Sequence, residues 1–195
     1  IGALEYLLPK EYIDTMKVLH SNAPENPVED MYKVIKMDLK KDYRELFSSF
    51  EKKPLGIASL AQVHKATLKT GEVVAVKVQH PYVRNNSTVD MICMEIMVNL
   101  MAFLFPDFKV KWLFDESKRN LPAELDFINE GHNTEKVAQQ FRKYSWLKVP
   151  KINWNLSSSR VLVMEFVEGG FITDLDYMHK HKIDPFEVSN KLGQL

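Results

Sequence analysis

Apolar and polar residues alternate most regularly between residues 61 and 79, and this stretch predicts a β-hairpin. Residues 61–68 have a two-residue period, and residues 72–79 are a dense run of valines, both of which are typical of strands. Lys69-Thr70-Gly71 lies between the two runs. Glycine adopts the positive φ that a tight hairpin turn needs, so Gly71 is expected to close the turn.

The second strand carries a cation in the middle of its valines. Alternate side chains point to opposite faces of a strand. One face, expected to enter a core, carries Val74, Val76 and Val78. The other carries Val73, Ala75 and, about 7 Å beyond Ala75, Lys77. A buried ammonium requires an anion, so this face suits a nucleotide, with the base on Ala75 and the phosphates on Lys77. The alternative is an edge-strand lysine that reaches solvent.

Periods of three to four residues predict helices on both sides of the hairpin. The predicted helical stretches are 10–20, the apolar positions from Pro27 to Phe50, 85–105, 111–119, 122–144, 173–182 and 185–195. Two strand-like runs, 148–153 and 160–167, are separated by a serine turn. Because alternating βαβ units are absent, the order favours an α+β fold with a small antiparallel sheet over a doubly wound sheet.

The stretch 85–105 is the most apolar of the predicted helices, with Asn86 or Ser87 as its expected cap. Its apolar part covers about 15 residues, whereas about 20 are needed to cross a bilayer. Glu95 and Asn99 also interrupt it. We therefore expect a buried or partner-facing helix, with a membrane-surface role as an alternative.

Composition excludes several classes of protein. With 45% apolar and 27% charged residues the 195-residue chain is globular. A net charge of zero without long like-charge runs argues against nucleic acid as the main partner. The single cysteine, Cys93, excludes an intrachain disulfide. The chain lacks an initiator methionine and is expected to be part of a longer protein.

The segment before the hairpin can be compared with the glycine-rich loop of protein kinases, G-x-G-x-x-G-x-V. The corresponding residues are Gly56, Ala58, Ala61 and Val63, so alanine replaces two of the three glycines. Alanine stiffens the backbone and adds a methyl group. The strand that follows reads Val-Ala-Val-Lys and ends at Lys77, in the order of the kinase V-A-I-K strand.

A kinase-like site also needs a helix carboxylate beside its lysine. The helix predicted from Pro122 supplies Glu124, Asp126 and Glu130. Asp126 and Glu130 are four residues apart and would share a face, whereas Glu124 would point to another sector. The alternative is an acidic helix face exposed to solvent.

The strand ending at Met164 runs into a linker broken by Gly169-Gly170. An apolar strand followed by such a linker resembles the hinge between kinase lobes. We expect backbone groups of Glu165 and Val167 to bind the adenine edge, behind Met164.

Together these pieces resemble the UbiB/ADCK family of atypical kinases, also called the aarF-domain family. The resemblance covers nearly the whole chain. Its specific marks are the Ala-rich segment 58–64, the V-K-V-Q-H-P run 76–81 and the E-x-D motif 124–126. Gly131 departs from the alanine usual in the family.

The resemblance implies a protein-kinase-like N-lobe with extra helices. Residues 1–53 would be an N-terminal helical extension, and 54–168 the N-lobe, with helices inserted at about 85–144. Residues 169–195 would be the truncated start of a C-lobe.

The family also implies roles for residues. Lys77 would contact ATP phosphates with Glu130 as its partner, while Glu124 and Asp126 would form an acidic cluster nearby. The nucleotide-binding set would comprise Gly56, Ala58, Ser59, Ala61, Val63, Ala75, Lys77, Met164, Glu165 and Val167. The resemblance implies that the protein is mitochondrial, as members are in eukaryotes, and is linked to coenzyme Q or mitochondrial lipid homeostasis. It implies ATP binding and ATPase-like activity rather than protein phosphorylation.

The chain lacks an H-R-D-type catalytic aspartate and a D-F-G motif. We therefore expect it to hold no metal site of its own, Mg²⁺ binding only with a C-lobe, and to be inactive alone. The alternatives are a non-catalytic pseudokinase scaffold and a lipid- or membrane-associated regulatory module.

Overall fold

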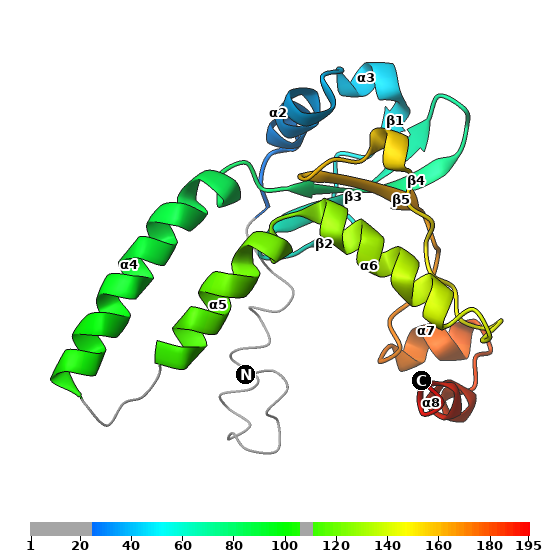
Figure 1. Ribbon diagram of the computed structural model, residues 1–195. Helices are drawn as coiled ribbons and strands as arrows, with labels where there is room; N and C mark the ends of the chain where they lie inside the picture. Colours follow the sequence, from blue (N-terminus) through cyan, green and yellow to red (C-terminus); the bar gives the residue numbers. More distant parts are fainter. Residues whose placement is uncertain (1–24, 106–110) are drawn as a thin grey trace.

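The computed structural model describes residues 25–105 and 111–195, which form a small antiparallel sheet with helices against both faces (Figure 1). The strands are β1 (Phe47–Phe50), β2 (Gly56–Ile57), β3 (Ala61–Leu68), β4 (Val73–Gln79) and β5 (Val161–Glu165). The helices are α2 (Val28–Leu39), α3 (Tyr43–Leu46), α4 (Val83–Leu104), α5 (Lys111–Glu124), α6 (Phe127–Gln140), the 3-10 helix η1 (Trp154–Leu156), α7 (Leu175–Lys180) and α8 (Pro185–Leu192). The α+β prediction is confirmed. The helix predicted at 10–20 lies outside the described residues.

The predicted hairpin is β3 and β4, at the centre of the sheet. The strand order is β1-β3-β4-β5, and β2 pairs with β3 beside β1. Gly71 has a φ of 91° and closes the turn, as expected. The register places Val63 opposite Lys77 on β3, and Leu162 opposite Lys77 on β5.

The valine face of β4 packs into the main core. Val74, Val76 and Val78 are buried, as are Val161 and Val163 of β5. The α2 side chains that cover them are Met31, Val34 and Ile35. The opposite face of the sheet packs on α6 through a smaller cluster of Ala61, Phe127 and Leu162. Lys77 is on the α6 side of the sheet and therefore lies between the sheet and this helix.

Residues 47–50 are strand β1, so the helical prediction for them is wrong. Helix α3 has a complete capping box from Asp42 and Glu45, yet it ends after one turn because the backbone becomes extended at Phe47. The edge of β3 supplies hydrogen-bond partners for this segment. Such pairing is a tertiary effect that outweighs local periodicity.

The helix predicted from Pro122 is divided differently in the structure. Pro122 lies within α5, and a new helix, α6, begins at Phe127 with Asp126 as its N-cap. The Asp126 carboxylate accepts a hydrogen bond from the Ile128 N–H at 3.0 Å. Asp126 therefore does not share a helical face with Glu130, as had been predicted.

Two further predictions are corrected. Residues 148–153 form only an isolated bridge, between Ile152 and Met164, rather than a strand. Pro150 within this segment has no N–H to donate to a ladder. Helix α4 begins at Val83, where Tyr82 makes no side-chain cap, so the predicted caps at Asn86 and Ser87 are wrong.

Helices α4 and α5 project from the sheet as an arm (Figure 1). The stretch Asn86–Leu104 of α4 is long and apolar enough to cross a membrane by length and composition, and none of it is buried within the described chain. Of the two predicted roles of this helix, burial is wrong within the described residues, whereas contact with a partner stays a prediction.

The polar side chain of His64 is fully buried beside the main core. Burial lowers the pKa of His64 below its ordinary value, although the ring contacts the Glu51 carbonyl oxygen at 2.9 Å through Nδ1. The unfolded chain takes up this proton near pH 6.5, and the folded chain only at lower pH. Stability is therefore expected to fall as the pH drops below about 6.5.

This prediction is checked by urea unfolding at pH 7 and pH 5. We expect the loss of unfolding free energy between the two pH values to be smaller in His64→Gln than in the wild type. Equal losses in the two proteins would contradict it.

Candidate functional site

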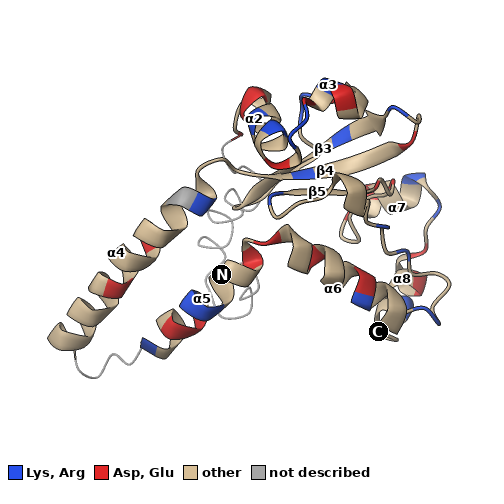
Figure 2. Cartoon of the chain, turned by 45° about the horizontal axis from the view of Figure 1, so that its top comes forward, with Lys and Arg blue, Asp and Glu red and all other residues tan. Residues whose placement is uncertain are grey.

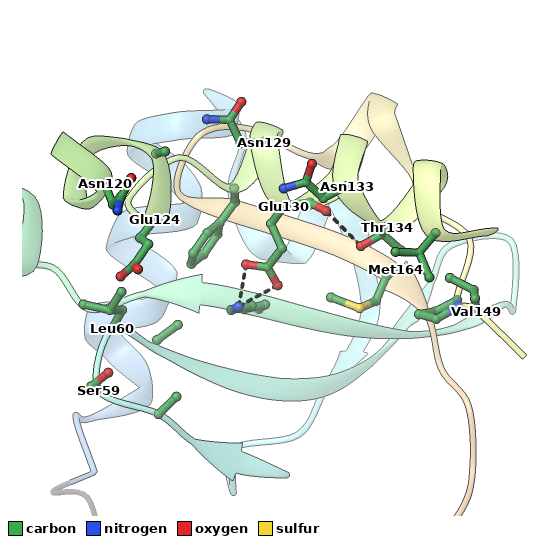
Figure 3. Close-up of a pocket in the computed structure, with 17 residues that line it drawn as sticks. Ser59, Leu60, Asn120, Glu124, Asn129, Glu130, Asn133, Thr134, Val149 and Met164 are labelled. Atoms are coloured by element: carbon green, nitrogen blue, oxygen red, sulfur yellow. Dashed lines mark hydrogen bonds and ion pairs between the residues drawn. The ribbon is translucent and has the colours of Figure 1, made fainter. Parts of the chain in front are cut away.

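Lys77 and Glu130 form an ion pair on the α6 side of the sheet. The Lys77 ammonium donates to both carboxylate oxygens of Glu130 at 2.6 Å, as the dashed lines in Figure 3 show. Their side chains are 22% and 41% exposed. The ammonium also lies 4.8 Å from the centre of the Phe127 ring, close enough for a cation–π interaction. Lys77 is thus held within the lobe and is not an edge lysine in solvent.

The start of α6 is fixed to the sheet, which places Glu130. Phe127 is fully buried, and its N–H donates to the Ser159 carbonyl at 3.0 Å. Just before it, the Gln79 side-chain amide donates to the Leu125 carbonyl at 3.1 Å. Glu130 follows Phe127 by three residues, so both side chains project from the same side of the helix. The buried Phe127 therefore directs Glu130 toward Lys77.

Trp154 of η1 packs against the middle of α6. Its ring packs on Gly131, where an added methyl carbon would lie 2.5 Å from Cη2. The indole N–H donates to the Glu135 carboxylate at 2.6 Å, and the ring lies 4.7 Å from that of His132. This contact explains the glycine at 131, because any larger residue would collide with the tryptophan.

Gly131→Ala is expected to destabilise the protein by up to about 2 kcal/mol. Alanine improves helix propensity by about 1 kcal/mol, but overpacking a closely filled site costs about 1–3 kcal/mol. Thermal unfolding of Gly131→Ala, Trp154→Leu and the double variant checks this. The double variant should lose less than the sum of the two single losses. A raised melting temperature in Gly131→Ala would contradict the prediction, because it would show that the Trp154 ring moves aside without cost.

A cavity of about 1100 Å³ lies beside the ion pair (Figure 3). The predicted site residues that line it are Ala58, Ser59, Ala61, Lys77, Glu124, Glu130 and Met164. They come from the segment before β3, from the strands β3, β4 and β5 and from the helices α5 and α6. The structure thus gathers residues that are more than 100 positions apart in the chain.

Other predicted residues do not line this cavity. Val63 lies opposite Lys77, and Ala75 lies opposite Met164, so both share the cavity face of the sheet. Gly56 pairs with Val63 from β2. Asp126 caps α6 and lines a separate cavity between α4 and α5.

The two hinge residues lie at the end of β5. Val167 is exposed. The Glu165 N–H already donates to the Lys151 carbonyl at 2.8 Å, so this N–H is not free for an adenine edge. The Glu165 side chain pairs with Lys148 at 2.6 Å. This hydrogen bond, with that from the Lys151 N–H, lowers the Glu165 pKa.

Several lining residues were not predicted from the sequence. They are Leu60, Asn120, Ala123, Phe127, Asn129, Asn133, Thr134, Val137, Val149 and Pro150. Asn129 and Asn133 are spaced as i and i+4 on one face of α6, a signal that could have placed them beside Glu130 once the start of the helix was known. The place of Phe127 in the site could be predicted only by knowing that α6 begins after Asp126.

Comparison with known proteins identifies relatives over the whole chain. A model of the ABC1 atypical kinase-like domain matches residues 18–195. AarF domain-containing kinase 1 of Drosophila melanogaster is 69% identical over 195 residues, which are 100% of this chain and 38% of that protein. ABC1 family protein MCP2 of Saccharomyces cerevisiae is 40% identical, over 100% of this chain and 35% of that protein.

A solved structure shares the fold. The complex of Rv3197 with erythromycin from Mycobacterium tuberculosis superposes with a TM-score of 0.63 at 30% identity, covering 86% of this chain and 43% of that one. The chain therefore spans well under half the length of these relatives. Its small antiparallel sheet and helices form a kinase-like N-lobe, and the chain belongs to the ABC1 atypical kinase-like family.

Proposed function

We propose that this chain supplies the phosphate-facing part of an ATP site. The observation that carries the proposal is the Lys77–Glu130 ion pair at the wall of the cavity. A lysine held by a helix carboxylate is the arrangement that kinase-like lobes use for nucleotide phosphates. The pair holds the ammonium in place before a ligand arrives.

The lining of the cavity fits a nucleotide. Phe127 and Met164 provide apolar surface for a base, and Lys77 provides the positive charge. Lys77 is the single cation among the described lining residues, which also include Glu124 and Glu130. A polyphosphate would therefore need a further cation, and Mg²⁺ is the ion that accompanies ATP in such sites.

The metal would need ligands from elsewhere in the protein. Within residues 25–105 and 111–195, no group of three His, Cys, Asp or Glu side chains could hold a metal ion. We therefore propose that Mg²⁺ binds together with ATP, and that parts of the full-length protein outside this chain complete the site. Phosphoryl transfer or ATP hydrolysis would then belong to the whole protein.

Calorimetric titration of the full-length protein with ATP and Mg²⁺ tests the proposal. We expect saturable binding of ATP and ADP, with weaker binding of ATP when Mg²⁺ is removed. No heat of binding with either nucleotide would overturn it. Hydrolysis of bound ATP separates an active enzyme from the alternative, a pseudokinase scaffold that binds ATP without turnover.

A second candidate function is contact with a membrane through the arm. Between Ile96 and Leu104, α4 carries no charged residue, and this end of the helix is tan in Figure 2. Phe103 is 81% exposed, and Trp112 of the neighbouring α5 is 69% exposed. Exposed apolar and aromatic surface at one end of a helical arm suits shallow insertion into lipid.

Flotation of the full-length protein with phospholipid vesicles tests this role. The double variant Phe103→Glu/Trp112→Glu should lose vesicle binding, whereas Val89→Glu, nearer the lobe, should keep it. Equal flotation of all three proteins would exclude insertion of this end of the arm.

The family resemblance supports a mitochondrial location and a role in lipid or coenzyme Q homeostasis as proposals. We propose this localisation for the full-length protein. Fractionation of cells that express the tagged full-length protein tests it, and recovery outside the mitochondrial fraction would contradict it.

A further inference from the structure

The segment Ala58–Ala61, here called the Ala-rich loop, is tied to the end of the strand that carries Lys77. The loop is closed by a hydrogen bond from the Ala58 N–H to the Ala61 carbonyl at 2.8 Å. His80, three residues after Lys77, bonds to the loop twice. Its backbone N–H donates to the Leu60 carbonyl at 2.9 Å, and its Nε2 lies 2.9 Å from the Ala58 carbonyl oxygen.

The partners of the His80 ring define its tautomer. A carbonyl oxygen only accepts hydrogen bonds, so Nε2 must carry the hydrogen that bonds to Ala58. In the neutral ring Nδ1 then accepts, and the Asn26 side-chain amide lies 2.7 Å from it. Asn26 is fixed in turn, because its backbone N–H donates to the side-chain oxygen of the buried Gln62 at 2.7 Å.

His80 is not among the residues that line the cavity, whereas Ala58, Ser59, Leu60 and Ala61 all are. The two hydrogen bonds from His80 to the loop therefore connect it to a ligand in the cavity. In a glycine-rich loop the backbone is free to settle around phosphates. Here the loop is held in one shape beforehand, which reduces the ordering cost of binding.

We infer that His80 is a positioning residue for nucleotide phosphates: it braces the Ala-rich loop in the shape that phosphates meet, at a constant distance from Lys77. This inference rests on the proposed ATP site. The hydrogen bonds from Asn26 to His80 and from His80 to Ala58 hold the loop in place. Their loss would weaken the binding of the phosphates of a nucleotide and not of its base.

The experiment uses the full-length protein and two conservative variants of His80. A glutamine amide can reach the position of Nε2 and bond to the Ala58 carbonyl, whereas an asparagine amide reaches only the position of Nδ1. Binding of ATP and of adenosine is measured by calorimetry for the wild type, His80→Gln and His80→Asn. Hydrogen exchange of the peptide that contains residues 55–61 is followed in parallel.

We expect His80→Asn to weaken ATP binding about fivefold to tenfold, the equivalent of one lost hydrogen bond. In His80→Asn, adenosine binding should stay unchanged and the amides of the loop should exchange faster. His80→Gln should keep most of the wild-type ATP affinity and most of the wild-type protection from exchange. The matched controls are His179→Asn and His179→Gln, which replace an exposed histidine of α7 and should change neither.

Two results would overturn the inference. One is equal ATP affinity in the wild type and in His80→Asn. The other is a parallel loss of ATP and adenosine binding in both His80 variants, which would show a purely structural role. If the wild type itself binds no ATP, the proposed function fails first, and the role of His80 at a nucleotide fails with it.

Discussion

Lys77→Met is expected to weaken ATP binding by about tenfold to a hundredfold. The substitution removes the single cation among the described lining residues and leaves the Glu130 carboxylate without its partner. A hydrogen bond to a charged group contributes about 1.5–3 kcal/mol, and each 1.4 kcal/mol is a tenfold change in affinity. Calorimetry on the full-length protein with ATP and Mg²⁺ measures the loss.

The control for this prediction is Lys118→Met. Lys118 forms an ion pair with Glu95 at 2.7 Å in the arm, outside the main cavity, so its loss should leave ATP binding unchanged. The double variant Lys77→Met/Glu130→Gln should bind ATP better than Lys77→Met alone, because the repulsive carboxylate is removed as well. ATP binding that is insensitive to Lys77→Met would place the phosphates elsewhere.

Asp38→Ala is expected to reduce the free energy of unfolding by about 3–5 kcal/mol, as when one partner of a buried ion pair is removed. Asp38, near the end of α2, pairs with Arg160 at the start of β5, and their side chains are only 12% and 15% exposed. Ser158 also donates to Asp38 at 2.7 Å. The change therefore leaves a buried guanidinium uncompensated and loosens α2 from the sheet.

The same carboxylate makes the protein sensitive to acid. Burial by itself raises the pKa of Asp38, but hydrogen bonds from Arg160 and Ser158 outweigh it and leave the pKa lowered. The pair stabilises the fold above the ordinary aspartate pKa of about 3.9. Its contribution is lost as the pH falls through the lower pKa of the folded state.

Urea unfolding at pH 7 and at pH 3 measures both effects. The double variant Asp38→Ala/Arg160→Met should be more stable than Asp38→Ala alone. Glu187→Ala, which breaks an exposed pair with Lys191, should cost less than about 1 kcal/mol. If Asp38→Ala costs no more than Glu187→Ala, the pair would not hold α2 to the sheet.

The central hairpin and the two groups of its ion pair could be predicted without the structure. Strand alternation is local, so the periodicity from 61 to 79 placed Lys77 on one face and the core valines on the other. The resemblance to known kinase-like sequences paired Lys77 with Glu130 across 53 positions. The antiparallel α+β fold followed from the order of the predicted elements.

Other features depended on contacts between distant segments. Residues 47–50 became a strand because the edge of β3 offers hydrogen-bond partners. The start of α6 depends on Phe127, which is buried against the sheet, and on the bond of its N–H to Ser159. Periodicity within one segment carries no information about either partner.

The sequence by itself determined the central hairpin, the face of its second strand that carries Lys77 and the loop that precedes it, since these properties depend on near neighbours along the chain. Only the tertiary structure decided that Trp154 requires a glycine at 131 and that His80 braces the Ala-rich loop. It also decided that α4 leaves its apolar surface uncovered within the described chain. These outcomes depend on side-chain volumes and hydrogen-bond partners that meet only after the segments have packed.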